Sequence, residues 1–330
     1  MQPGLSTHVF FQHRLHPGLL DALAAAGART IEVFAARHHF DYTDAPAVRE
    51  LAAWFRSNDV HAVLHQPIYL LSEGGRDFSS ADAAQWSRHV APNLNLIAAE
   101  KSHRIAAMDE VKRALESAEQ VPFTAIVLDL GLRDAPWDEH ALEHSLTAIE
   151  HLKAFAAPLG VRLLLQNLQN EVATPDHLLY ILMTGHFDSV GVCLDVGHLH
   201  LAQDSSPPAS TQKSGAPSSA VTLPPKLSSD SGVGAAIELL GPRIAQVHLH
   251  DNHGAFAHTV DMKDEHLWPG FGSIDWPAVC SALAALSAAT PGILEIAGDR
   301  DEPAESVARK AEAAFRMLAI TQSTQLSQNM

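Results

Sequence analysis

The segment VGVCLDVGH, residues 190–198, decides how this chain can fold. It begins as an uninterrupted apolar run, which is the composition of a parallel strand buried on both faces. It ends in a carboxylate and an imidazole, Asp195 and His198. Charged groups at the end of a buried strand need a partner or a function. The segment therefore predicts a β-strand whose carboxyl end carries functional groups.

Seven further segments repeat this pattern of a short apolar run near an Ala/Leu-rich stretch of helical period. The predicted strands are 7–12, 29–34, 60–65, 124–130, 161–167, 190–196, 244–250 and 292–297. The predicted helices are 17–26, 45–57, 98–120, 138–157, 174–185, 233–240, 276–288 and 303–318. Eight strand and helix units within 330 residues predict an α/β fold, a single-domain (β/α)8 TIM barrel.

Residues 203–231 interrupt this alternation with nine Ser and five Pro among 29 residues. Such a segment buries too little apolar surface to offset the entropy lost on ordering the backbone. We expect a disordered insertion after the sixth strand, either a mobile lid over the active face of the barrel or a neutral insertion. Residues 320–330 are expected to form a flexible tail.

The chain has 38 Asp and Glu against 22 Lys and Arg, a net charge of −16, and 21 His. Phosphate backbones and anionic membrane surfaces repel such a chain, so nucleic acid and membranes are poor candidate partners. No segment reaches the ~18 apolar residues of a membrane span, and the start lacks a signal-peptide core, so we expect a cytoplasmic protein. Two cysteines make no disulfide framework. Oligomerisation stays open.

Six of the predicted strands end in polar side chains, where a buried strand should stay apolar. These residues are His65, Asp129, Gln166, Asp195 with His198, His248 with Asp251, and Glu295. The carboxyl ends of barrel strands converge on one pocket, and carboxylates gathered there stay unfavourable unless a cation neutralises them. Any one of these residues alone would be explained as a helix cap or a loop contact. Six strands in succession predict a metal site.

Further donors flank this ring of strand ends. Asp264 and His266 are two residues apart in an irregular stretch. His38, His39 and His250 occur in short His-containing runs and are explained equally well as loop residues. Mixed imidazole and carboxylate ligands favour a divalent metal such as Mn, Zn, Mg or Co, and the near absence of cysteine argues against thiolate ligands.

The chain resembles the xylose isomerase-like barrel superfamily in an ordered set of motifs, namely IEVFAARHHFDY (31–42), LHQP (64–67), CLDVGH (193–198), VHLHDNHG (247–254), HLWPGFGSIDW (266–276) and LEI (294–296). That superfamily holds sugar and sugar-phosphate isomerases and epimerases, related dehydratases and apurinic-site endonucleases. The resemblance implies one metal held by Gln166, Asp195, His248 and Glu295. On the pattern of the nuclease branch it implies a second ion at His198, Asp264 and His266, and a third at His65 and Asp129.

Two positions depart from the family pattern. Gln166 stands where the family has a Glu on strand five, and Asp129 stands where the metal-rich branch has a His on strand four. An amide oxygen can bind a divalent ion, but an amide cannot accept or return a proton. The pair of acid/base glutamates that the resemblance implies is therefore reduced to Glu295, and Asp129 could restore the lost charge. The candidates for the missing base are His198, Glu32 and the pair His38 and His39.

The leading hypothesis is a metal-dependent isomerase or epimerase of sugars or sugar phosphates that acts through a metal-stabilised enediolate. Glu295 is the predicted base, with His198 and Gln166 as further catalytic residues. The small polyhydroxylated substrate is predicted to contact Glu32, His38, His39, His250 and Asp251. Three alternatives stay open: a keto-polyol dehydratase, a multi-zinc phosphodiesterase similar to the apurinic-site endonucleases, and a barrel that has lost catalysis through Gln166.

Overall fold

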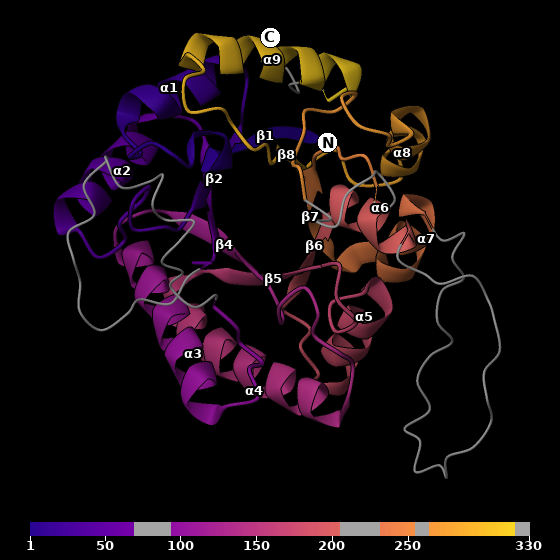
Figure 1. The fold of residues 1–330 in the computed structure, drawn as a ribbon. Helices are drawn as coiled ribbons and strands as arrows, with labels where there is room; N and C mark the ends of the chain where they lie inside the picture. Colours follow the sequence, from indigo (N-terminus) through magenta and orange to yellow (C-terminus); the bar gives the residue numbers. More distant parts are fainter. Residues whose placement is uncertain (69–93, 205–231, 255–263, 321–330) are drawn as a thin grey trace, which may run out of the picture.

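Eight parallel strands close into a barrel in the computed structural model, which describes residues 1–68, 94–204, 232–254 and 264–320 (Figure 1). The strands are β1 (Gln2–Ser6), β2 (Thr30–Phe34), β3 (His61–His65), β4 (Phe123–Leu128), β5 (Arg162–Gln166), β6 (Gly191–Asp195), β7 (Ile244–Leu249) and β8 (Pro291–Leu294). Each strand pairs with the next along the chain, and β8 pairs with β1 to complete the circle. The predicted α/β TIM barrel is confirmed.

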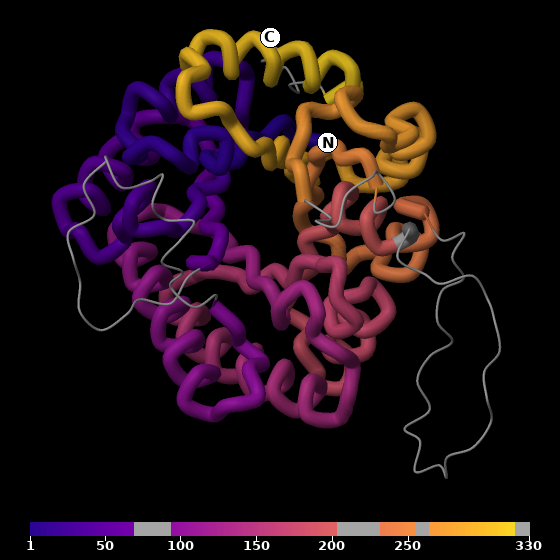
Figure 2. Tube along the Cα trace, viewed as in Figure 1, coloured from indigo at the N-terminus to yellow at the C-terminus, as the bar shows by residue number. Residues whose placement is uncertain are grey.

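Helices surround the barrel and form the outer ring visible in Figure 2. They are α1 (Pro17–Ala25), α2 (Ala45–Ser57), α3 (Lys101–Leu115), α4 (Glu139–Ala156), α5 (Pro175–Thr184), α6 (Val196–Asp204), α7 (Val233–Leu240), α8 (Trp276–Leu283) and α9 (Ala304–Met317). Short 3-10 helices are η1 (Thr7–Phe10), η2 (Glu116–Glu119), η3 (Ala157–Leu159) and η4 (Gly241–Arg243). The last helix, α9, packs beside α1, so the helical ring closes as the sheet does. Within the described ranges, no helix has both the length and the apolar composition needed to cross a membrane.

Two apolar layers follow from the alternation of side chains along each strand. Residues that face outward, such as Ile31, Leu64 and Ile126, are buried beneath the helices in the main core. Residues that face inward form a second, smaller cluster, which consists of Val63, Ala125, Val127, Leu164 and Cys193. The barrel is thus filled by side chains, and its interior is a packed core up to the level at which polar groups begin.

The first predicted strand, 7–12, is wrong. The strand is Gln2–Ser6, and residues Thr7–Phe10 form η1, whose first turn is capped by the Ser6 hydroxyl accepting from the His8 amide. Pro3 and Gly4 give the true strand a poor β-propensity, whereas the apolar run after it imitates a strand. A Cβ at position 4 would lie 2.2 Å from Cδ1 of Ile293, so a larger residue there would require the Ile293 side chain to move.

Two further boundaries differ from the sequence prediction. Strand β6 leads directly into α6, which begins because the Asp195 carboxylate accepts a hydrogen bond from the His198 amide (2.7 Å), as a helix cap does. Because α6 runs to Asp204, it overlaps the start of the predicted insertion 203–231, and residues 205–231 lie outside the described residues. Ile320, the first residue of the predicted tail 320–330, is buried in the core, and residues 321–330 lie outside the described residues.

The loop after β8 packs so closely against η1 that one added methyl group at Gly298 should destabilise the protein. A Cβ at Gly298 would lie 1.8 Å from the Val9 carbonyl oxygen, so Gly298→Ala must displace backbone. We expect this substitution to lower the free energy of unfolding by about 1–3 kcal/mol, the usual cost of overpacking, as measured by urea denaturation. The matched control is Gly234→Ala in α7, where the nearest atom to a Cβ is 3.8 Å away. An equal loss of stability in both variants would contradict the packing argument.

Candidate metal centre

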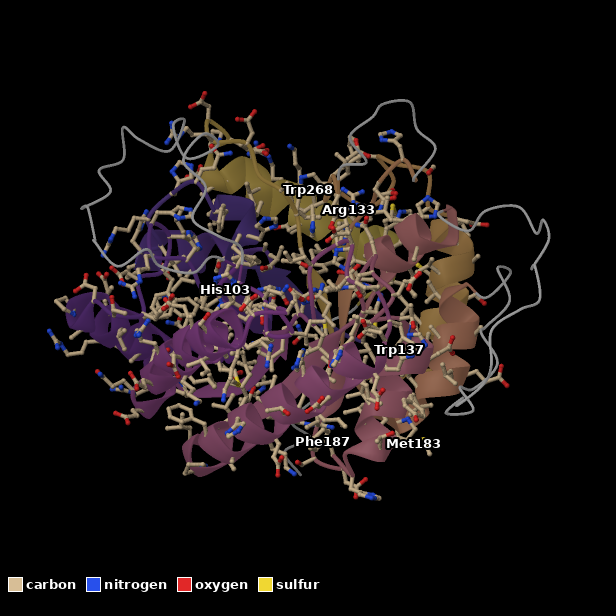
Figure 3. All side chains as sticks on the ribbon, turned by 60° about the horizontal axis from the view of Figure 1, so that its bottom comes forward. His103, Arg133, Trp137, Met183, Phe187 and Trp268 are labelled. Carbon is tan, nitrogen blue, oxygen red and sulfur yellow. The ribbon has the colours of Figure 1, made fainter. Side chains whose placement is uncertain are left out.

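The inward-facing positions of the strands change from apolar to polar at their carboxyl ends. Four polar residues each follow, by two positions, an apolar residue of the inner cluster, and they are His65, Asp129, Gln166 and Asp195. Strand β7 adds His248, and Glu295 directly follows β8. Because side chains alternate with a period of two, these groups all point inward at the same end of the barrel. Arg133 and Trp268 lie at that end in Figure 3, and Met183 and Phe187 lie at the other.

Gln166, Asp195, His248 and Glu295, here called the quartet, meet inside the barrel. The Gln166 Nε2 donates a hydrogen bond to Asp195 Oδ2 (2.9 Å). His248 Nδ1 lies 2.8 Å from Glu295 Oε2 and 3.6 Å from Asp195 Oδ2. All four residues are buried. The sequence analysis therefore selected four residues that the fold brings into one cluster.

Three polar atoms of the quartet have no hydrogen-bond partner, namely Gln166 Oε1, His248 Nδ1 and Glu295 Oε2. Buried polar atoms are nearly always satisfied, so three orphans in one cluster need an explanation. Donor atoms that share a divalent ion at ~2.1 Å lie roughly 3 Å apart, and His248 Nδ1 has Glu295 Oε2 at 2.8 Å and Asp195 Oδ2 at 3.6 Å. The set of oxygen and nitrogen donors, with two carboxylates, therefore fits a divalent cation.

Glu32 fixes the orientation of the His248 ring. The His248 Nε2–H donates to Glu32 Oε2 (2.9 Å), and Gln246 Nε2 donates to the same oxygen (2.6 Å). A hydrogen on Nε2 leaves the lone pair on Nδ1, the atom that faces Glu295. Glu32 is fully buried beneath the quartet. Its position supports a role in orienting His248 instead of the predicted contact with substrate.

A second cluster consists of His198, His250, Asp264 and His266, whose donor atoms lie within 4.8 Å of one another. Asp264 Oδ2 is 2.6 Å from His198 Nε2 and 3.1 Å from His266 Nε2. Each of these two rings donates its Nδ1–H to a backbone carbonyl, of Asn167 and of Glu295 respectively (both 2.9 Å). The carbonyls thereby aim both Nε2 atoms at Asp264. The predicted grouping of His198, Asp264 and His266 is present, and His250 joins it.

Opposite charges control ionisation in the second cluster. Burial opposes the charged form of His198, but the Asp195 and Asp264 carboxylates prevail and raise its pKa to about 10. Burial is likewise outweighed at His266, whose pKa Asp264 raises to about 9. In the same way His266 and His198 hold the pKa of Asp264 well below its usual range despite burial. Protonated histidines thus balance the carboxylates, in the place where a cation would do so.

The third predicted metal site, the pair His65 and Asp129, has no third ligand in the described part of the chain and stays a prediction. In the described part of the chain, no group of three or more metal-ligating side chains contains His65 or Asp129. His65 stacks on Phe34 with ring centroids 4.3 Å apart, and its Nδ1–H donates to the Gln66 carbonyl (3.1 Å). Asp129 instead lies beside a cavity and has an unpartnered Oδ1.

Three predicted substrate contacts are used to hold the backbone. His39 contacts the His13 carbonyl (2.6 Å) and the Thr7 hydroxyl (2.9 Å) through its two ring nitrogens. His38 donates to the Phe11 carbonyl (3.0 Å). Asp251 accepts from the amides of Asn252, Gly270 and Ile274 and from the Trp276 indole. Their hydrogen-bond partners give these residues structural roles, and their predicted contacts with substrate stay predictions.

A cavity of about 640 Å³ opens at the carboxyl ends of the strands, and His198, Asp264 and His266 of the second cluster line it. Five residues that line it carry a buried polar atom without a hydrogen-bond partner, and they are His8, Gln66, Asp129, Gln169 and Asp264. Arg133, labelled in Figure 3, is the one Lys or Arg among its described lining residues. The cavity is thus rich in unsatisfied acceptors, and the cationic groups among its described lining residues are Arg133 and the protonated rings of His198 and His266.

Three of these lining residues, His8, Gln66 and Gln169, were missed by the sequence analysis. His8 was assigned to a strand, although it lies in η1 and stacks on Phe34 at 4.9 Å. Burial lowers the pKa of His8 to about 3, so its ring is neutral. The two glutamines do follow strands β3 and β5 closely, in the runs LHQP and LQNLQ, and that placement was the available signal.

Comparison with solved structures finds barrels of the same fold across nearly the whole chain. The IOLI protein crystallised with a zinc atom has a TM-score of 0.67 at 16% identity, covering 98% of this chain and 100% of that one. A D-psicose 3-epimerase in the presence of D-fructose has a TM-score of 0.65 at 15% identity, covering 97% and 100%. The D-psicose 3-epimerase from Clostridium cellulolyticum H10, with D-tagatose, has a TM-score of 0.64 at 15% identity, covering 97% and 98%. At such identities the likeness is one of fold.

Sequence comparison adds a relative and a family. "Uncharacterized protein y4fM" of Sinorhizobium fredii (strain NBRC 101917 / NGR234) is 34% identical over 119 residues. The match spans 36% of this chain and 27% of that protein, so it covers about a quarter of the length of the relative. Residues 20–318 match the family described as "Xylose isomerase-like TIM barrel". This match spans the barrel from α1 to the end of α9, and the chain belongs to the xylose isomerase-like TIM barrel family.

Proposed function

We propose that this protein is a metal-dependent isomerase or epimerase of a small sugar or sugar phosphate. The observation that carries the proposal is the set of five unpartnered polar atoms on residues that line the cavity beside the quartet. Four are carbonyl or carboxylate oxygens, and the fifth is the Nδ1 of His8. Buried acceptors need donors, and the hydroxyl groups of a polyol supply donors in that number.

The quartet would hold the metal through Asp195 Oδ2, His248 Nδ1, Glu295 Oε2 and Gln166 Oε1. A bound Mn, Zn, Mg or Co ion supplies Lewis-acid stabilisation of negative charge on a substrate oxygen. The solved structures of similar fold support this proposal, because the IOLI protein binds a zinc atom and two others are D-psicose 3-epimerases.

Glu295 is the group placed to move a proton. Burial opposes its charged form, but the neighbouring His248 and His266 hold the pKa of Glu295 well below its usual range. The carboxylate is therefore ionised at neutral pH and can accept a proton from a carbon next to a carbonyl group. A dehydratase would begin with the same proton transfer, so the residues of the site are compatible with both reactions.

The second cluster favours one other candidate function, a multi-zinc phosphodiesterase. His198, Asp264 and His266 have the donor atoms that a zinc ion prefers, and a metal-bound hydroxide attacks phosphorus in such enzymes. Against this candidate stand the net charge of −16 and a cavity with one Lys or Arg among its described lining residues. We therefore rank the sugar reaction first.

Incubation of the Mn-loaded protein with D-fructose, D-tagatose, D-psicose and L-ribulose, each as the free sugar and as its phosphate ester, in D2O tests the proposed function. We expect the proton next to the carbonyl of at least one sugar to exchange for deuterium and a new epimer to appear in the NMR spectrum. Asp195→Ala and His248→Ala should lose both bound metal and exchange. Absence of exchange in all four sugars would leave the non-catalytic alternative, whereas cleavage of abasic DNA with two or more bound zinc ions would favour the phosphodiesterase.

The hydrogen bond from His248 to Glu32 predicts a loss of metal affinity in Glu32→Gln. The amide removes the carboxylate that fixes the Nε2–H form of the ring, and such outer partners are typically worth a factor of about 10–100 in metal affinity. Titration of the metal-free protein with Mn in competition with a chelator measures the change. Glu110→Gln is the matched control, because Glu110 is equally buried but pairs with Tyr42, Arg37 and Arg113 between β2 and α3. Equal affinity in wild type and Glu32→Gln would show that the contact does not orient the ligand.

A further inference from the structure

Gln166 leaves the proposed epimerase without a second proton-transferring group on β5. Inversion at a carbon atom requires removal of a proton on one face and delivery on the other. Among the four candidates raised by the sequence, Glu32 is bound to His248 below the quartet, and His38 and His39 hold backbone carbonyls. His198 does line the cavity, but its two ring nitrogens contact the Asn167 carbonyl and Asp264.

Asp129 stands next to Gln166 in the sheet. Strands β4 and β5 pair in the register Leu128 with Leu165, so the next residues along, Asp129 and Gln166, occupy the same level of the barrel. A carboxylate on β4 thus lies beside the position at which β5 has lost one. Asp129 follows Val127 of the inner cluster by two residues, which points its side chain inward.

Asp129 is also open to substrate. It lines the cavity, and its Oδ1 is buried without a hydrogen-bond partner. In the closed order β1 to β8, three strands separate β4 from β8 in either direction, so Asp129 and Glu295 lie on opposite sides of the barrel at its carboxyl end. Asp129 lines the cavity, and the Glu295 carbonyl accepts a hydrogen bond from His266, which lines it too. A substrate that extends from the cavity to the quartet would present one face to each carboxyl group.

We propose that Asp129 is the second catalytic acid/base of this barrel and transfers a proton on the face of the substrate opposite to Glu295. The inference rests on the proposed epimerase function. Burial raises the pKa of Asp129, and the Glu295 charge acts in the same direction against the lowering effect of nearby histidines. A raised pKa favours a carboxyl group that holds a proton until it is delivered.

The proton transfers of one turnover balance. Glu295 forms a bond to the proton on the carbon next to the carbonyl, and the electron pair of the broken C–H bond moves onto that carbonyl. Protonated Asp129 then gives its proton to the same carbon from the other side, and the electron pair returns to re-form the C=O bond. The product is the epimer, Glu295 is left protonated and Asp129 ionised, and exchange of one proton each with water restores the starting state.

The acid/base role of Asp129 is tested with the Mn-loaded variants Asp129→Asn and Asp129→Ala. The measurement is the uptake of deuterium by each of the two epimers of the sugar that the wild type converts. We expect conversion between epimers to fall about 100-fold or more, the usual contribution of a general acid or base. The epimer whose C–H faces Glu295 should still take up deuterium, because removal and return on that face need only Glu295. The opposite epimer should lose exchange. Asp129→Glu should recover part of the conversion.

Asp134→Asn is the matched control, since Asp134 is an exposed acid in the same loop and should leave conversion and exchange unchanged. Conversion by either Asp129 variant within about threefold of wild type overturns the inference and leaves the proposed function standing. Loss of exchange in both epimers with unchanged Mn affinity also overturns it, because Asp129 would then only shape the cavity. A wild type that exchanges no sugar of the panel overturns the proposed function itself and this inference with it.

Discussion

Buried negative charge at the carboxyl end of the barrel is the constraint on which the rest of the site depends. Glu32 on β2, Asp195 on β6 and Glu295 directly after β8 are buried, where an unpaired carboxylate is strongly unfavourable. His248 lies among all three and contacts each of them within 3.6 Å. One imidazole cannot balance three carboxylates, and the lone pairs that remain on the quartet converge where a cation would sit. Charge balance therefore specifies the site more strongly than any single residue does.

The alternation of side chains along each strand also places the residues that stabilise the fold and those that form the site on opposite faces of the sheet. Outward-facing residues pack under the helices and supply the apolar burial that closes the barrel, so the inward-facing positions near the carboxyl ends are free to be polar. Along β5, for example, Leu163 and Leu165 belong to the main core, Leu164 belongs to the inner cluster, and Gln166 begins the site. The change from an apolar to a polar inward-facing residue, two positions apart, thus marks where the packed interior of the barrel ends and the site begins.

The pattern of the sequence predicted the barrel and the quartet because both depend on features that repeat locally, namely apolar runs and the polar residue that ends each run. It failed where a side chain takes its role from a distant partner. Glu32 meets Gln246, 214 residues further along the chain, and nothing near Glu32 indicates that it orients His248. His8 was hidden because Pro3 and Gly4 disguise the true β1, and only the pairing with β2 and β8 reveals it. Periodicity defines the face on which a residue lies, whereas its partners follow from the closed sheet.

A carboxyl group at Asp129, at the end of β4, can act differently from one at position 166 on the neighbouring strand β5. A carboxylate that binds a cation is held ionised, because the positive charge favours its deprotonated form. At position 166 the neutral amide donates to Asp195 and leaves an oxygen for the ion without adding a third negative charge to the quartet. On β4 at the same level, Asp129 belongs to no described metal-ligating group, and burial favours its protonated form. Strands β5 and β4 thus divide between them the functions of coordination and proton transfer, whereas Glu295 after β8 would bind the cation and accept the proton of the substrate.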